Sequence, residues 1–336
     1  MKKVLAGIIA IMGCFIEAKA VDANTVEIVF NGSTATVTVA DNIKSYVTVN
    51  SGTSSHVNLV QAATFAGVDA TASNSNGEII YKLSGTSTDG EFYVEGSFKC
   101  IVQLNGVTLT NPSGPAINIQ NGKRIKLSAL SGTTNTLTDG ANDTYNGCFH
   151  CKGHTEFQGK GTLNVYGNSK HAVYSKEYIE IKNLTLNVKS AVKDGIHCKQ
   201  YFLMKSGTVN IAGAQDDGIQ VELDGTTATT GTGYGYDDED TGNFYMEAGT
   251  LTITSPGSYC IKADGSITYD GGTRNFDTTN TLTDALTAGI DTTTLLTTGT
   301  EAVYDLNGRQ MTEGDDLPKG IYIIKHNGAS RKMFVK

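Results

Sequence analysis

The sequence predicts an all-β protein that folds as a right-handed parallel β-helix with about 23 residues per coil. Two markers recur at a fixed interval. The first is a small residue followed by a large apolar one, and its apolar members are Phe149, Val173, Ile196, Ile219 and Ile261. The second marker consists of Leu163, Leu186, Val209 and Leu251. Both advance by 23 or 24 residues and then by 42, so the last interval is one repeat plus an insertion of 19 residues.

Alternation within each repeat is the third observation, because successive side chains of a strand point to opposite faces. In Gly195–Lys199, Ile196 and Cys198 share one face, while His197 and Lys199 share the other. Stepping by one repeat predicts inward ladders that are apolar or small throughout: Cys151, Ser175, Cys198, Val221 and Ala263; Phe157, Ile181, Met204 and Met246; Val165, Val188, Ile211 and Ile253. Three short strands cannot bury these faces alone, whereas coils stacked about 4.8 Å apart can. The leucine-rich pattern and the four-stranded propeller period are both missing.

Flanking segments differ from this repeat and suggest five regions. Residues 1–20 resemble a secretory signal peptide, with Ala18-Lys19-Ala20 as the cleavage site and a lipoprotein site at Cys14 as the alternative. We expect an N-terminal β cap over 21–97, the β-helix over 98–276, a linker or terminal cover over 277–300, and a small C-terminal β segment over 301–336. Thr133–Asn146 is expected to be a polar excursion.

Charge and cysteine content limit the possible partners. The formal net charge is −8, and removing residues 1–20 makes it −10, which argues against nucleic acid and suits divalent cations or simple solubility. No other segment is predicted to cross a membrane. Cys148-x-x-Cys151 has no second pair and so does not indicate zinc. Cys151 and Cys198 lie two coils apart, beyond disulfide reach, and are expected to pack in the core.

Lysines form one predicted outward ladder, Lys152, Lys176 and Lys199, beside Tyr174 and His197. Stacked ammonium groups repel one another unless an anion lies across them or they splay into water. The functional interpretation is a positive strip that binds the carboxylates of an acidic polysaccharide, with the two rings as stacking surfaces. The alternative is an ordinary solvated edge.

Carboxylates form a second outward group. Asp194 and Asp217 stack on adjacent coils, and Asp216 adds a third carboxylate. Like charges this close favour a bridging cation, and Ca²⁺ takes six to eight oxygen ligands; Asp-Gly turn chemistry without a metal is the alternative. The insertion carries an acidic run that is either a calcium loop or a disordered loop: Asp237, Asp238, Glu239 and Asp240.

No combination of nucleophile, base and acid emerges, so no catalytic residue is predicted. If the protein were a polysaccharide lyase that acts by β-elimination, Lys199 or Lys193 near the aspartates would be the base. A hydrolase needs two carboxylates at a defined separation, which a sequence does not give.

Several motifs together resemble a known secreted family. They are Gln103–Asn111, Gly114–Ile117, Thr133–Gly140, Lys193-Asp194-Gly195-Ile196, Asp216-Asp217-Gly218-Ile219 and Asp238–Gly242. They are similar to those of a carbohydrate-binding parallel β-helix family related in fold to pectate lyases. That resemblance implies bound calcium at Asp194, Asp216, Asp217 and 237–240, and binding to polygalacturonate. Two repeats depart from its Asp-Gly-Ile pattern, with His171-Ala172-Val173 and Tyr259-Cys260-Ile261, which would reduce the calcium set.

The last segment, with Leu317-Pro318-Lys319-Gly320, resembles sorting domains of the type IX secretion pathway of Gram-negative bacteria. Taken together, these features predict a secreted or cell-surface protein of such a bacterium. We expect a monomer that binds an acidic polysaccharide in a calcium-dependent manner and without catalysis. The alternatives are the lyase and a surface adhesin or structural protein.

Overall fold

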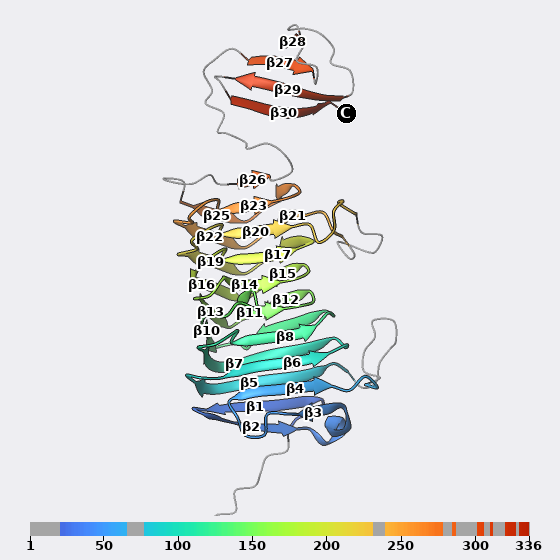
Figure 1. Cartoon of the computed structure of the whole chain (residues 1–336), viewed down its shortest axis with the longest axis vertical. Coiled ribbons are helices and arrows are strands. Elements are labelled where there is room, and N and C mark those ends of the chain that lie inside the picture. Colours follow the sequence, from blue (N-terminus) through green and yellow to red (C-terminus); the bar gives the residue numbers. More distant parts are fainter. Residues whose placement is uncertain are drawn as a thin grey trace, which may run out of the picture.

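The computed structural model describes residues 21–65, 77–230, 239–277, 284–286, 301–305, 310–311, 320–326 and 329–335. Nearly all regular structure in these ranges is β-strand, with one short 3-10 helix at Asp41–Tyr46. The strands stack along one axis in parallel, in-register ladders (Figure 1). The all-β, solenoid-like architecture expected from the repeat is therefore confirmed. In the described residues, no helix is both long enough and apolar enough to span a membrane.

Ladder 1 is a ten-stranded sheet that carries the first strand of each repeat. Its strands are β3 (Val47–Val49), β4 (His56–Gln61), β6 (Glu91–Gly96), β8 (Ile117–Asn121), β11 (Gly147–Cys151), β14 (His171–Ser175), β17 (Ile196–Lys199), β20 (Ile219–Glu222), β23 (Ile261–Ala263) and β26 (Asp284–Leu286). All neighbouring pairs except β3 and β4 are parallel.

Ladders 2 and 3 carry the second and third strands of each repeat. Ladder 2 contains β9 (Ile125–Ala129), β12 (Thr155–Gly159), β15 (Ile179–Lys182), β18 (Tyr201–Met204), β21 (Asn243–Met246) and β24 (Ile267–Tyr269). Ladder 3 contains β10 (Thr134–Asp139), β13 (Thr162–Gly167), β16 (Thr185–Ala191), β19 (Thr208–Ala212), β22 (Thr250–Thr254) and β25 (Thr273–Phe276). The long strand β7 (Cys100–Asn111) pairs with both β9 and β10 and so joins the two ladders into one sheet.

The strand registers reproduce the predicted inward ladders. Phe149 pairs with Val173, Val173 with Ile196, and Ile196 with Ile219, and the series ends at Ile261. Corresponding pairs hold in ladders 2 and 3. The 19-residue insertion falls between β20 and β21, so the coils before and after it keep their register. Counting the repeat in the sequence therefore located both the strands and the insertion.

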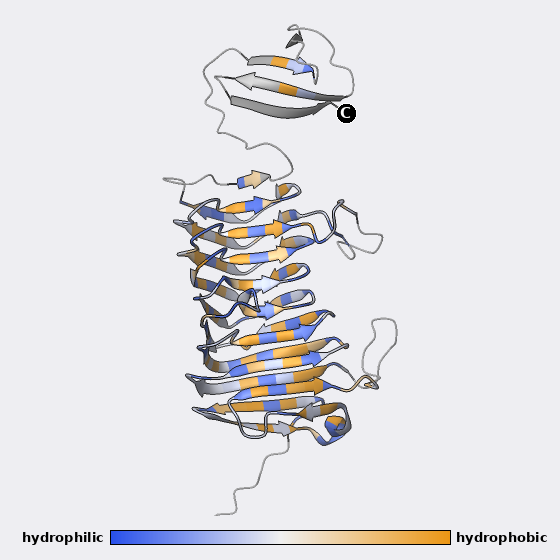
Figure 2. Cartoon of the chain, in the orientation of Figure 1, coloured by the Kyte–Doolittle hydropathy of each residue, from blue (hydrophilic) through white to orange (hydrophobic). Residues whose placement is uncertain are grey.

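The core is the interior enclosed by the three ladders. Strands alternate apolar and polar residues along their length (Figure 2), and the inward members are fully buried, among them Phe149, Phe157, Phe202 and Phe244. All five cysteines of the described residues are buried as well, and Cys151 and Cys198 are free thiols, as their positions predicted. Burial raises the pKa of the Cys151 thiol to about 12, so it remains protonated and acts as a small apolar side chain.

Two segments differ from the sequence-based picture. Thr133–Asn146 is not wholly an excursion, because Thr134–Asp139 forms β10, which pairs in parallel with β7 and β13. The strand was not recognised in the sequence because it lacks a run of apolar residues. Its inward positions are Asn135, Leu137 and Asp139, of which only Leu137 is apolar. Parallel stacking also continues into 21–97 through β1 (Thr25–Asn31), β5 (Ile79–Ser87), β6 and β4, while β2 (Thr34–Val39) and β3 add antiparallel pairs at this end.

The C-terminal residues form a separate four-stranded antiparallel sheet. It contains β27 (Glu301–Asp305), β28 (Gln310–Met311), β29 (Gly320–His326) and β30 (Ala329–Val335). The expected signal peptide and most of the expected linker lie outside the described residues.

Candidate functional site

The outward face of ladder 1 gathers most of the residues singled out from the sequence. Tyr174 and His197 occupy paired positions on β14 and β17, and their ring centroids lie 5.5 Å apart with an interplanar angle of 23°. His150 stacks on the other face of Tyr174 at 5.1 Å. We call His150, Tyr174 and His197 the aromatic strip. Tyr174 and His197 are largely buried by this mutual stacking, so less ring surface is open than their outward direction suggested.

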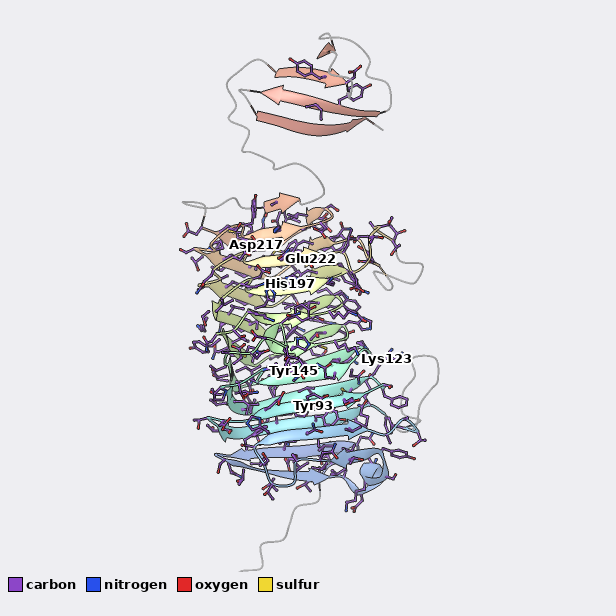
Figure 3. All side chains as sticks on the ribbon, in the orientation of Figure 1. Tyr93, Lys123, Tyr145, His197, Asp217 and Glu222 are labelled. Atoms are coloured by element: carbon purple, nitrogen blue, oxygen red, sulfur yellow. The ribbon has the colours of Figure 1, made fainter. Side chains whose placement is uncertain are left out.

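Tyr145 extends the aromatic strip and was missed in the sequence. Its ring meets that of His150 edge to face at 5.2 Å. It belongs to the loop between β10 and β11, which lies outside the repeat, so no ladder position pointed to it. The labelled Tyr145 and His197 lie on the same side of the stack, with the coil of β14 between them (Figure 3).

The three predicted lysines have different surroundings. Lys152 and Lys176 are exposed, and no carboxylate of the described residues lies within 4.0 Å of either ammonium group. Lys199 is half-buried, with its Nζ 3.9 Å from Glu222 Oε2 and 3.8 Å from Asp224 Oδ1. Of these three lysines, Lys152 and Lys176 thus offer uncompensated positive charge to a ligand.

The aspartates of the Asp-Gly-Ile repeats have a structural task that the sequence did not reveal. Asp194 Oδ1 accepts the main-chain N–H of Asp217 at 3.1 Å, and Asp217 Oδ1 accepts the main-chain N–H of Tyr259 at 2.9 Å. His171 Nδ1 accepts the N–H of Asp194 at 3.3 Å in the equivalent position. Each of these side chains therefore satisfies a donor on the next coil, and both aspartates are buried, not outward.

The glycines after these aspartates are required by close packing. A Cβ at Gly218 would lie 2.6 Å from the carbonyl oxygen of Cys260 and 2.7 Å from Ile253 Cγ2. Gly195 is equally confined, between Gly218 O and Ile211. The Asp-Gly-Ile motif is thus explained by packing between coils, and any ligand has to use atoms that this packing leaves free.

Asp194 is held between two imidazoles. Its Oδ2 lies 3.1 Å from His171 Nδ1 and 2.9 Å from His197 Nδ1, and His197 Nε2 lies 3.4 Å from Glu222 Oε2. Burial opposes ionisation of Asp194, but the two imidazoles beside its Oδ2 outweigh it and hold its pKa far below the ordinary range. Burial also tends to lower the pKa of His197, yet Asp194 and Glu222 raise it overall. The pKa of His171 is lowered, because burial dominates there.

The oxygen atoms around Asp217 could hold a cation. Ligand oxygens of Asp194, Asp216 and Asp217 lie within 4.8 Å of one another. Asp217 Oδ2 is fully buried without a hydrogen-bond partner among the described residues, and Lys262 Nζ stands 3.5 Å away. Burial raises the pKa of Asp217, as expected for a carboxylate with an unsatisfied oxygen. An orphaned oxygen beside two further carboxylates fits a hard divalent ion such as Ca²⁺.

The described half of the acidic run is engaged within the protein. Glu239 Oε1 accepts hydrogen bonds from Asn243 Nδ2 at 3.2 Å and from the Tyr245 hydroxyl at 2.7 Å. Asp240 accepts the main-chain N–H groups of Asp224 and Gly225 at 2.9 and 2.7 Å. Asp237 and Asp238 lie outside the described residues. Glu239 and Asp240 thus fasten the insertion, and the structure does not bring them into the Asp194 cluster.

The two lysines considered for lyase chemistry are poorly suited as bases. Lys193 is exposed, and Lys199 is engaged by Glu222 and Asp224.

Comparisons with known proteins agree with this architecture. Residues 66–312 match the family described as carbohydrate-binding domain-containing protein. A protein of that description from Acetivibrio thermocellus is 27% identical over 112 residues, which are 30% of this chain and 39% of the relative. This chain therefore matches about two fifths of that relative's length. A solved structure described as a polysaccharide lyase-like protein from C. thermocellum, a gadolinium derivative, has a TM-score of 0.53 at 19% identity and covers 77% of this chain and 99% of its own.

Proposed function

Because the chain belongs to the family of carbohydrate-binding domain-containing proteins, we propose that it binds an acidic polysaccharide in a calcium-dependent manner and without catalysis. The observation that carries the proposal is the position of exposed Lys152 and Lys176 beside the aromatic strip on ladder 1. Regularly spaced ammonium groups attract the carboxylates of a uronate chain, and the partly exposed rings of Tyr145 and His150 can pack against its sugar rings. We include in the proposal a right-handed parallel β-helix and a monomeric state.

Calcium enters through the oxygen cluster. Asp216, the Oδ2 atom of Asp217 and the carboxylate of Asp194 would hold the ion, whose charge would neutralise a uronate carboxylate. When no metal is bound, Lys262 balances the charge of Asp217, because its Nζ lies 3.5 Å from Asp217 Oδ2. We extend the proposal to secretion, with residues 1–20 as signal peptide, 277–300 as linker and 301–336 as type IX sorting tail at the surface of a Gram-negative bacterium.

Calcium dependence is tested by co-sedimentation of the mature protein with polygalacturonate. We expect binding in Ca²⁺, loss of most binding in chelator, and recovery when Ca²⁺ is restored. Asp217→Asn should weaken calcium-dependent binding about tenfold, because the amide oxygen can still accept the Tyr259 N–H while the charge is lost. A neutral glucan serves as control. Binding that ignores chelator, or no binding at all, would refute this function.

The lysines give a second test. The double variant Lys152→Glu and Lys176→Glu should bind polygalacturonate about tenfold more weakly at low salt, with the difference shrinking as salt rises, because exposed charges contribute about 1 kcal/mol or less each and are screened. The matched control is Lys182→Glu with Lys189→Glu, two exposed lysines on ladders 2 and 3. Equal losses in the two double variants would show that net charge, not the ladder 1 lysines, governs binding.

The lyase alternative is examined in the same mixtures. Release of unsaturated uronates, seen as new ultraviolet absorbance, would establish an enzyme. Because Glu222 and Asp224 already contact Lys199, we expect no new ultraviolet absorbance. A glycan array without hits would favour the third alternative, a surface adhesin or structural protein.

A further inference from the structure

A second cluster of potential metal ligands lies beside the calcium candidate and has a different chemistry. His171 Nδ1, Asp194 Oδ2 and His197 Nδ1 all lie within 4.8 Å of one another, and all three residues are buried. They come from the starts of two successive coils, at and just before β14 and β17. The sequence hid this cluster, because His197 was interpreted as a stacking ring and His171 as a departure from the Asp-Gly-Ile pattern.

The contacts of the two histidines allow tautomers in which both Nδ1 atoms direct a lone pair toward Asp194 Oδ2. His171 Nδ1 accepts the main-chain N–H of Asp194, which requires an unprotonated Nδ1. His197 Nε2 lies 3.4 Å from Glu222 Oε2, and this carboxylate favours a proton on Nε2, which can leave Nδ1 unprotonated. Asp194 Oδ2 is 3.1 and 2.9 Å from these two nitrogens. Without an ion, the 2.9 Å contact between His197 Nδ1 and Asp194 Oδ2 is a hydrogen bond in which Nδ1 carries the proton. With that proton released or placed on Nε2, three acceptor atoms face one another, an arrangement that becomes favourable when a cation lies between them.

We propose that His171, Asp194 and His197 bind a divalent transition metal, with Zn²⁺ as the ion that the donor set fits best. Two imidazoles and one carboxylate are ligands that Zn²⁺, Co²⁺ and similar ions accept, whereas Ca²⁺ takes oxygen donors almost alone. Zinc bonds of about 2.0–2.2 Å in a tetrahedron place ligand atoms about 3.4 Å apart, so the two nitrogens have to move only a few tenths of an ångström away from Asp194 Oδ2.

Glu222 strengthens this assignment. A metal-bound histidine commonly donates its other ring nitrogen to a carboxylate, which fixes the tautomer and orients the ring, and Glu222 occupies that place relative to His197. Glu222 pairs with Lys199 across β17 and β20 and follows Gln220, whose amide donates to it at 2.9 Å. His197 and Glu222 are labelled on adjacent coils in Figure 3. This site shares Asp194 with the calcium candidate, whereas His171 and His197 belong to it alone, and it does not depend on the polysaccharide proposal.

The test is Co²⁺ and Zn²⁺ binding to the mature chain after removal of bound metal. We expect one Co²⁺ per chain with visible ligand-field absorption, displaced by Zn²⁺. His171→Asn keeps an acceptor for the Asp194 N–H but removes the imidazole, and should lower Co²⁺ affinity at least tenfold. His197→Gln is a second variant should the first fail to fold, with folding followed by circular dichroism.

Two controls separate this site from its surroundings. His154→Ala removes an imidazole that pairs with Glu177 outside the cluster and should leave Co²⁺ binding unchanged. Asp216→Asn should weaken Ca²⁺ binding and leave Co²⁺ binding unchanged, so failure of the calcium proposal and failure of this one can be told apart. Absence of Co²⁺ binding in the wild-type protein, or equal affinity in wild type, His171→Asn and His197→Gln, would overturn the assignment.

Discussion

Phe149→Ala is expected to lower the free energy of unfolding by about 3–5 kcal/mol, the usual cost of removing a fully buried phenyl ring. Phe149 is 0% exposed and lies in the core between Ile117 on β8 and Val173 on β14. Its ring centroid is 5.1 Å from that of Phe157 on ladder 2 of the same coil. The substitution therefore removes contacts along the stack and across it, and rigid neighbouring coils limit collapse of the cavity.

Urea denaturation followed by circular dichroism measures this effect. Tyr166→Ala is the matched control, since Tyr166 is an aromatic residue of the neighbouring ladder 3 strand β13 that is 39% exposed, and it should cost less than about 1 kcal/mol. Because each coil contacts only its neighbours, the loss should appear first in the coils beside β11. Equal costs for the two variants would mean that the inward ladder does not support the fold as described.

The repeat made the fold predictable to a degree unusual for a single sequence. A parallel stack in register requires the same residue class at the same position of every coil. The common core environment is therefore visible in the sequence as a series of apolar residues at the repeat spacing: Phe149, Val173, Ile196 and Ile219. Where a coil uses polar inward residues, the signal fails. Asn135 on β10 is fully buried, and its side chain accepts the main-chain N–H groups of Gly106 and Val107 at 2.8 and 3.0 Å. Nothing in its residue type distinguishes it from a loop asparagine.

The candidate site was predicted less completely, for a physical reason. Alternation assigns a side chain to a face, but it does not say which neighbour that side chain will bond. Asp194 and Asp217 were placed together correctly, yet each uses one oxygen to satisfy a main-chain donor of the next coil. Lys199 was grouped with Lys152 and Lys176, although Glu222 one coil further neutralises it. Tyr145 lies outside the repeat and could not be placed at all.

Asp139 makes the stability of the coil that supports Tyr145 dependent on pH. It ends β10, is 2% exposed, and accepts the main-chain N–H of Asn168 at 2.5 Å through Oδ1, while Oδ2 has no hydrogen-bond partner among the described residues. Burial raises its pKa from 3.8 to about 6, although hydrogen bonds from the main chain oppose the rise. The Asp139 carboxyl directly precedes the loop that places Tyr145 against His150.

Stability should therefore fall as the pH rises across this window. Between pH 3.8 and about 6 the folded protein retains the Asp139 proton that the unfolded chain has released, so the free energy of unfolding decreases with pH and levels off above about 6. A shift of about two pH units corresponds to about 3 kcal/mol.

Other carboxylates, including Asp194 with its lowered pKa, contribute slopes of opposite sign. The informative quantity is thus the difference between wild type and Asp139→Asn, which stays neutral at every pH. Urea denaturation at pH 4, 5, 6 and 7 should show the wild type losing up to about 3 kcal/mol relative to the variant over this range. A difference independent of pH would mean that the Asp139 carboxyl is solvated. It would then not be the buried group that precedes and supports the Tyr145 loop.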